Sequence, residues 1–277
     1  MRSHAKRDWL ARLTVLGLLA GGTPQAAWIL VDDFSGGTGN WTVSQTGSGT
    51  VGIVTNTLTS GPNPGPVGTV AKLDMSSTTS NKYAFMTSKS TYSRGDAAVL
   101  KVAFDLGYTQ TPTNAYNGYG HYLSLVTSST ATTNSCLAGH VGGMGTDVTN
   151  RYAFYMKAGT GATTFSGTSA RQLTGTWYHY ELSMTASQTI LNAFTWTSSN
   201  PADYLAASPV WSQSSATGIG TGNYYLRLTN LQPFLDTATQ SRDIMYADNV
   251  YYLVPEPAAL ALLGLGALGL AGRRRRR

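Results

Sequence analysis

Short runs in which hydrophobic and polar residues alternate recur between residues 28 and 253, and clusters of Gly, Asn and Pro separate them. In residues 98–106, a period of two places the even-numbered side chains on an inner face and leaves Lys101 and Asp105 on the outer face. The same alternation predicts strands over residues 69–75, 83–87, 121–127, 152–156, 177–185, 189–197, 224–229 and 244–253. Many short strands with no helices between them predict an all-β antiparallel sandwich or barrel.

The clearest local unit covers residues 176–198, which we predict to form an antiparallel hairpin with a turn at residues 186–188. Its first strand places large apolar side chains on one face, namely Tyr178, Tyr180, Leu182 and Met184. The opposite face of that strand carries Trp177, His179, Glu181 and Ser183. We therefore assign the first set to the core and the second set to the outside of the sheet.

A signal carried by only a few residues favours one family of sandwich folds. The sequence Gly-Thr-Trp-Tyr at residues 175–178 opens an alternating strand, Asp32 and Asp33 stand near the start of the domain, and Asp248-Asn249 stands near its end. This arrangement resembles the concanavalin A-like jelly rolls, which include laminin-G and glucanase domains. The resemblance implies a jelly-roll β-sandwich over residues 28–253. Within it, we interpret the glycine-rich residues 139–145 as a loop.

The N-terminus carries a targeting pattern. Basic residues at Arg2, Lys6, Arg7 and Arg12 precede an apolar run over residues 13–20 and a small-residue stretch that ends at Ala27. This order is typical of a secretory signal peptide. We predict that residues 1–27 form a signal helix that signal peptidase removes.

The C-terminus carries a second targeting pattern. Pro255, Glu256 and Pro257 precede a run of only Ala, Leu and Gly over residues 258–272, and an arginine cluster that begins with Arg273 and Arg274 follows. As a helix this run would be about 22 Å long, so snorkelling arginines would let it span a membrane with its basic end in the cytoplasm.

Residues 254–277 thus resemble the sorting signal of PEP-CTERM proteins. The resemblance implies export, transient anchoring in the inner membrane, processing by exosortase, and a final place at the cell surface or outside the cell.

The charge of the mature domain excludes a nucleic-acid binder. The whole chain has a formal net charge of +6, but nine of its basic residues lie in the two targeting segments. Residues 28–253 hold 10 Lys and Arg against 11 Asp and Glu, which leaves a net charge of about −1 and no basic stripe. The single cysteine, Cys136, allows no internal disulfide, and we interpret it as a small buried hydrophobic residue.

Polysaccharide is the ligand class that the residue pattern favours. On the outer face of a strand, the indole of Trp177 could stack on a sugar while His179 and Glu181 form hydrogen bonds. Tyr225 and Arg227 flank Leu226 in the same way on another strand. Tyr155 and Lys157 stand two positions apart, in a similar pair, on a third. The carbohydrate-binding residues that we predict are Trp177, His179, Glu181, Tyr225 and Arg227. The alternative is that these side chains pack under loops or against a second sheet.

Catalysis has a weaker basis in the sequence. A glycoside hydrolase needs two carboxylates, and glucanases of this superfamily carry Glu-x-Asp-x-x-Glu on one strand. Here Glu181 is the only glutamate in residues 28–253, and its neighbours on the same face are His179 and Ser183. A lyase could use a histidine and a tyrosine, and the Gly-x-Ser-x-Gly motif of esterases is absent. We expect a non-catalytic protein; the alternative is a polysaccharide-degrading hydrolase or lyase.

One metal hypothesis concerns the ends of the domain. Asp32, Asp33, Asp248 and Asn249 carry the oxygen ligands that calcium prefers, and the first and last strands of a jelly roll can lie side by side. A structural calcium could therefore join the two ends, although Asp and Asn are also ordinary residues at strand ends. We predict no other cofactor.

Overall fold

The computed structural model describes residues 27–45, 49–58, 63–75, 82–95, 99–111, 119–131, 134–142, 152–159, 163–165, 171–172, 175–232 and 242–254. The predicted signal helix, the predicted membrane helix and the sorting residues Pro255, Glu256, Pro257, Arg273 and Arg274 lie outside these ranges. Within the described ranges, no helix is both long enough and apolar enough to cross a membrane. Residues 28–253 form one unit with its own core.

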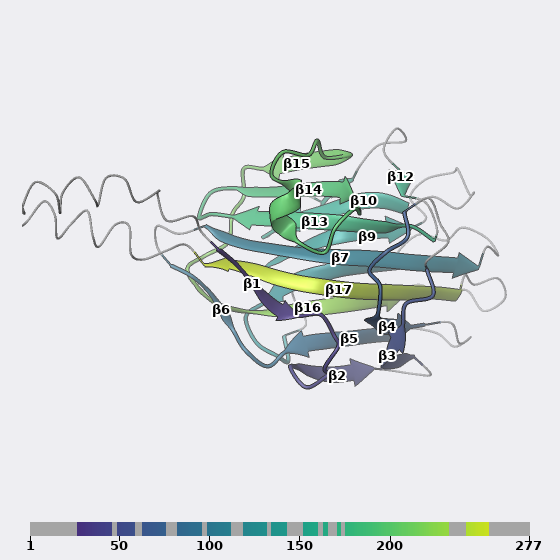
Figure 1. Cartoon of the computed structure of the whole chain (residues 1–277). Coiled ribbons are helices and arrows are strands. Elements are labelled where there is room, and N and C mark those ends of the chain that lie inside the picture. The colour runs from purple at the N-terminus through teal and green to yellow at the C-terminus, as the bar shows by residue number, and fades with distance from the viewer. Residues whose placement is uncertain are drawn as a thin grey trace, which may run out of the picture. The chain divides into compact units, whose positions relative to one another are not determined.

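Two antiparallel sheets make up this unit (Figure 1). We call the 8-stranded one sheet A. Its order is β15 (Trp211–Ser215), β14 (Thr189–Thr195), β13 (Trp177–Met184), β7 (Leu100–Thr111), β17 (Arg242–Val254), β4 (Thr69–Asp74) and β3 (Thr50–Thr55), and β1 (Ala27–Asp32) also pairs with β17.

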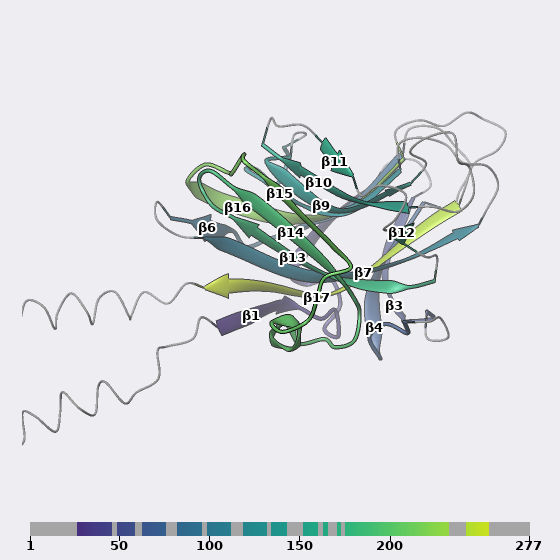
Figure 2. The ribbon, with the colours of Figure 1, turned by 90° about the horizontal axis from the view of Figure 1, so that it is seen from above.

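We call the 9-stranded one sheet B. Its order is β11 (Thr163–Phe165), β10 (Tyr152–Ala158), β9 (Cys136–Gly142), β8 (Tyr119–Val126), β16 (Gly222–Gln232), β5 (Lys82–Ser88) and β2 (Trp41–Gln45). In addition, β12 (Arg171–Gln172) pairs with β10, and β6 (Tyr92–Arg94) pairs with β16. A short 3-10 helix, η1 (Pro201–Tyr204), lies on the side of sheet A that faces away from sheet B (Figure 2).

The main core lies between the sheets and follows the predicted alternation. In β7, Leu100, Val102, Phe104 and Leu106 are all buried in it. Phe104 stacks on Tyr180 of β13, with ring centroids 5.1 Å apart, and Phe154 of sheet B meets Tyr178 edge to face. Cys136 is also in this core, where burial raises the pKa of its thiol to about 12, so it behaves as the predicted hydrophobic residue. Burial of each large side chain contributes about 1.5–3 kcal/mol to stability.

A second, smaller cluster lies on the outside of sheet A. It consists of Leu58, Val70, Trp177 and Tyr246, with Val54, Trp196 and Ile244 packed against it. The chain between β3 and β4 contributes Leu58 to this cluster and also places Gly65 against the indole of Trp177. This face of sheet A is therefore covered in part by loops.

The sequence interpretation of the glycine-rich segment is wrong for residues 139–142, and residues 143–145 lie outside the described ranges. We expected residues 139–145 to form a loop, but β9 continues through Gly142 and pairs with both β8 and β10. A Cβ atom at Gly139 would come within 2.2 Å of the carbonyl oxygen of His121. Glycine is needed here because neighbouring backbone approaches too closely for a side chain.

Candidate functional site

The outer face of β13 holds the residues that we predicted to form a sugar platform, and the structure buries two of them. Trp177 and His179 have no exposed surface, whereas Glu181 is partly exposed. The indole of Trp177 fits between two glycines: a Cβ atom would lie 2.1 Å from the ring at Gly65 and 2.6 Å from it at Gly107. The expectation that Trp177 faces solvent is corrected, because it fills a slot beneath a loop and offers no surface to a sugar in this conformation.

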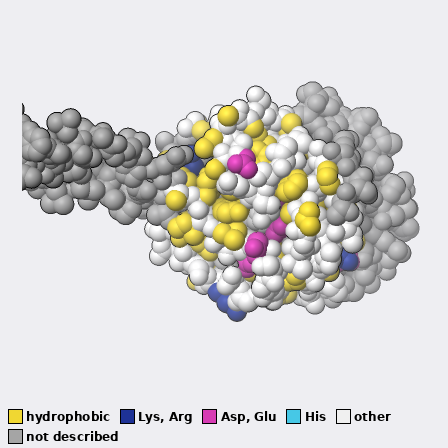
Figure 3. Space-filling view, viewed as in Figure 1, with side chains coloured by type: hydrophobic (Ala, Val, Ile, Leu, Met, Phe, Trp, Pro, Cys, Tyr) yellow, Lys and Arg dark blue, Asp and Glu magenta, His cyan; other side chains and the backbone are white. Residues whose placement is uncertain are grey.

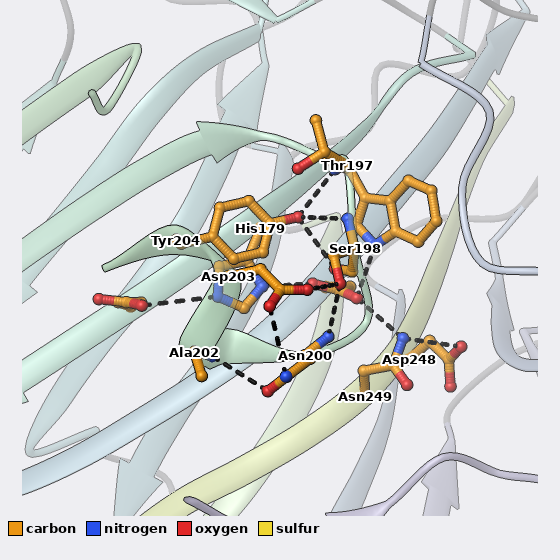
Figure 4. A network of polar contacts seen from close by, with 12 residues as sticks. His179, Thr197, Ser198, Asn200, Ala202, Asp203, Tyr204, Asp248 and Asn249 are labelled. Atoms are coloured by element: carbon orange, nitrogen blue, oxygen red, sulfur yellow. Dashed lines mark hydrogen bonds and ion pairs between the residues drawn. The ribbon is translucent and has the colours of Figure 1, made fainter. Parts of the chain in front are cut away.

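His179 belongs to a buried polar network, which we call the Asp105 network (Figure 4). Its centre is the carboxylate of Asp105 on β7, which lies directly opposite His179 in the sheet. Asp105 Oδ1 is 2.6 Å from His179 Nδ1. Asp105 Oδ2 accepts hydrogen bonds from Trp196 Nε1 at 2.8 Å and from Asn249 Nδ2 at 2.9 Å. Asp105 was predicted to point outward, and it does, yet it is fully buried.

The segment that follows β14 covers this network. Asn200 caps η1 by accepting a hydrogen bond from the backbone N–H of Ala202, and Pro201 occupies the first turn, which favours a helical start at this point. The helix delivers Tyr204, whose ring stacks on His179 with centroids 4.0 Å apart and planes 5° apart. The hydroxyl of Tyr204 accepts from the backbone N–H groups of Thr197 and Ser198, so the covering segment is held together by its own hydrogen bonds.

Glu181 connects the network to the surface. His179 Nε2 lies 3.9 Å from Glu181 Oε1, and neither atom has a hydrogen-bond partner among the described residues. Burial is the largest single influence on the pKa of His179 and lowers it, but the hydrogen bond and charge of Asp105 and the nearby carboxylate of Glu181 together outweigh it and raise that pKa. A charged imidazolium between two carboxylates stabilises both of them.

The arrangement has the connectivity of a catalytic acid–base pair without access for a substrate. A general base must reach the proton that it removes, and the ring of His179 lies beneath Tyr204 with no exposed surface. Figure 3, which views the molecule from the side of sheet A, shows no histidine among the described side chains on this face. In this conformation the geometry makes the Asp105 network a structural element.

Asp248 and Asn249 join the network through an irregularity in β17. The register between β17 and β7 shifts between Asp248 and Tyr251, and Asn249 adopts a φ of +49°. Asparagine tolerates this left-handed conformation better than most residues. The bulge turns the Asn249 amide toward Asp105, and the same amide nitrogen lies 3.2 Å from Asp248 Oδ2.

The other two predicted calcium ligands accept hydrogen bonds from residues close to them in the chain. Asp32 Oδ1 accepts from the backbone N–H of Phe34 at 2.7 Å, and Asp32 Oδ2 accepts from Trp41 Nε1 at 2.8 Å. Asp33 Oδ1 accepts from the backbone and hydroxyl of Ser35. Across the described part of the chain, no three His, Cys, Asp or Glu side chains are grouped so that they could hold a metal ion. The calcium hypothesis therefore stays a prediction from sequence.

Tyr225 and Arg227 lie on the opposite side of the molecule, on the outer face of sheet B. Tyr225 is partly exposed, whereas Arg227 is 6% exposed. The guanidinium group of Arg227 donates to Thr87 Oγ1 at 2.9 Å and to the carbonyl oxygens of Ala131 and Ser129 at 2.6 and 2.8 Å. It also lies 4.6 Å from the centre of the Phe85 ring, a cation–π contact. Arg227 therefore holds the loop after β8 in place.

The predicted residues do not converge on one site. Trp177, His179 and Glu181 face outward from sheet A, and Tyr225 and Arg227 face outward from sheet B. Residues that the prediction missed include Tyr204, which lies in η1 where the sequence has no strand pattern, and Phe85, which alternation places on the same face of its strand as Tyr83. Tyr83 stacks on Phe85 with ring centroids 4.9 Å apart, and both rings are partly exposed.

Comparison with known sequences identifies the C-terminal segment. Residues 253–276 match the PEP-CTERM protein-sorting motif. These residues are the sorting signal of the chain. The PEP-CTERM signal implies an exported protein that exosortase processes and that is sorted to the cell surface. No curated protein sequence matches the chain.

Comparison with solved structures identifies the fold of the domain that precedes this motif. The structure of "lectin UEA-II complexed with galactose" aligns with a TM-score of 0.50 and 9% identity, covering 82% of this chain and 98% of the lectin. The Emp47p carbohydrate recognition domain aligns with a TM-score of 0.48 and 8% identity over 82% of this chain and 95% of that domain. Lectin II from Ulex europaeus aligns with a TM-score of 0.46 and 9% identity over 83% of this chain and 98% of that lectin. The predicted all-β jelly-roll sandwich is confirmed, and at this identity the likeness concerns the fold alone.

Proposed function

We propose that this protein is an exported component of the cell surface or extracellular matrix that holds polysaccharide without catalysing its breakdown. Before processing, its C-terminal segment anchors it transiently in the inner membrane, and exosortase then acts on the sorting motif. The PEP-CTERM match at residues 253–276 supports export and sorting. A jelly-roll fold like that of a lectin solved with galactose supports a carbohydrate ligand.

One observation carries the binding proposal: partly exposed aromatic side chains from three strands share the outer face of sheet B. These are Tyr83 and Phe85 from β5, Tyr225 from β16 and Tyr155 from β10. Their neighbours along each strand, such as Ala84, Met86 and Leu226, are in the core. Flat rings on a sheet surface are suited to the apolar faces of sugar rings, and the tyrosine hydroxyls add hydrogen bonds.

The alternative function, polysaccharide degradation, would have to use the Asp105 network. That network contains an acid–base pair, but Tyr204 covers it and His179 has no exposed surface. The strand that carries Glu181 has no second carboxylate. The geometry therefore favours binding over catalysis.

The test uses residues 28–253, which form a unit with its own core. We expect this domain to be retained by at least one polysaccharide in a panel of immobilised glycans, without the release of reducing ends or unsaturated products. The Tyr225→Ala variant should lose retention. The matched control is Tyr251→Ala, which removes a partly exposed tyrosine from the outer face of sheet A and should bind normally. Absence of binding to every glycan would refute the proposal, and new chain ends would favour the enzyme.

A further inference from the structure

Acidic residues are distributed unequally between the two sheets. None of the strands of sheet B contains Asp or Glu, and the basic residues among their described side chains are Arg94, Lys157 and Arg227. The strands of sheet A carry both signs among their described side chains, with Asp32, Asp74, Asp105, Glu181 and Asp248 against Lys72 and Lys101. Viewed from sheet A, acidic side chains lie near the middle of the face and basic ones lie near its rim (Figure 3). The domain as a whole is close to neutral, so the positive charge of sheet B is local.

Arg227 is the centre of this positive face and has no acidic partner in the described structure. Its three hydrogen bonds all go to neutral oxygens, and its ring neighbour is Phe85. A buried charge without a counter-charge is unfavourable, and burial lowers the pKa of Arg227. A guanidinium group has five N–H donors, so these three bonds leave two donors on its terminal nitrogens. The hydrogen bonds of those terminal nitrogens are only partly buried.

A second pair of a cation and an aromatic ring lies on the same face. Tyr155 and Lys157 project outward from β10, and both are partly exposed. The register places Lys157 in the same row as Arg227, through Leu137 and Ser124. Three strand spacings of about 4.8 Å separate them by about 14 Å. The face thus offers two positions where a ring is beside a positive charge.

We propose that the outer face of sheet B binds an acidic polysaccharide, one of whose sugar rings stacks on Tyr155 while its carboxylates meet Arg227 and Lys157. This inference rests on the proposed function and specifies the ligand. A carboxylate matches the free donors of a guanidinium group and would supply the counter-charge that the face lacks. A neutral glycan would leave that charge unpaired.

The experiment compares two forms of one polymer: polygalacturonate, and the same polymer with its carboxylates methyl-esterified. We expect residues 28–253 to bind polygalacturonate, to bind the ester at least about tenfold more weakly, and to lose affinity as salt rises. Dextran sulfate against dextran tests whether sulfate replaces carboxylate. Equal affinity for the acidic and esterified forms would overturn the inference but leave the proposed function standing, and binding to no glycan would refute both.

Matched variants locate the site. Lys157→Gln and Lys101→Gln each remove one partly exposed lysine from a strand, the first on sheet B and the second on sheet A. We expect Lys157→Gln to weaken polygalacturonate binding several-fold and Lys101→Gln to leave it unchanged. Tyr155→Leu keeps an apolar side chain but removes the ring, and it should weaken binding by up to about tenfold. Equal effects of the two lysine variants would show that the polymer is attracted by overall charge and not by this face.

Discussion

Asp248 should make the stability of the domain fall as pH rises, and Asp248→Asn should remove this effect. Its side chain is 4% exposed, and no described residue forms a hydrogen bond with Oδ1. Burial is the main reason that the pKa of Asp248 is raised to about 8, and the nearby charges of Asp105, Asp33 and Asp32 raise it further. Below that pH the folded protein keeps this carboxyl neutral, which suits its buried position.

The sign and size of the effect follow from the two pKa values. In the unfolded chain an aspartate has a pKa of about 3.9, so the folded state binds the proton more tightly. The stabilisation is complete below about pH 4 and is lost as pH rises through about 8. Each pH unit between these limits costs about 1.4 kcal/mol, so between pH 5 and pH 8 the loss is on the order of 4 kcal/mol. An asparagine does not titrate and nearly matches the neutral acid in shape.

Urea denaturation of residues 28–253 at pH 5 and at pH 8 measures this difference. We expect the free energy of unfolding of the Asp248→Asn variant, relative to that of the parent protein, to be about 4 kcal/mol higher at pH 8 than at pH 5. Titration of His121 and His179 occurs in both proteins and cancels in the comparison. A stability difference that is the same at both pH values would show that Asp248 keeps an ordinary pKa, and the account of its burial would then be wrong.

Three further predictions concern the core, a buried histidine and processing. Trp177→Ala should cost about 3–5 kcal/mol in the free energy of unfolding because it leaves a cavity between Gly65 and Gly107; unchanged stability in urea denaturation would mean that the indole is exposed. Burial lowers the pKa of His121 to about 3, so stability should fall as pH falls from about 6.5 towards 3, and the His121→Asn variant should lose this dependence in the same assay. The extracellular protein should lack the signal peptide and the apolar C-terminal run, as measured by mass spectrometry; an intact chain in the cytosol would contradict export.

The strands that the sequence predicts best are those with one continuous apolar face. The residues of β7 and β13 that were assigned inward are buried in the core, because each of these strands packs along its length on the opposite sheet. The strands that were missed are short or lack strong alternation. Thr50–Thr55 is an edge strand with little buried surface, and Cys136–Gly142 contains the glycines that close packing requires. Local alternation carries little signal for such segments, because they lack a continuous apolar face.

The candidate site was harder to predict than the fold for a related reason. Alternation correctly placed Trp177, His179 and Glu181 on the face of β13 opposite the core. It could not show that Gly65, from the segment between β3 and β4, and Tyr204, from η1, cover that face. Arg227 illustrates the same limit, because its hydrogen bonds to the loop after β8 depend on a contact across about 100 residues of chain. A period of two identifies a side of the sheet, and only tertiary structure decides whether solvent reaches it.

The position of β17 has a mechanical consequence for a protein sorted by its C-terminus. This strand, Arg242–Val254, has β7 on one side and β4 on the other, and β1 also pairs with it. The sorting motif begins at residue 253, within the same strand. A pull on the tail therefore acts along a central strand and loads many of its hydrogen bonds at once, whereas a pull on an edge strand could break them one by one. A force on the tail would therefore be resisted in shear by the hydrogen bonds of β17.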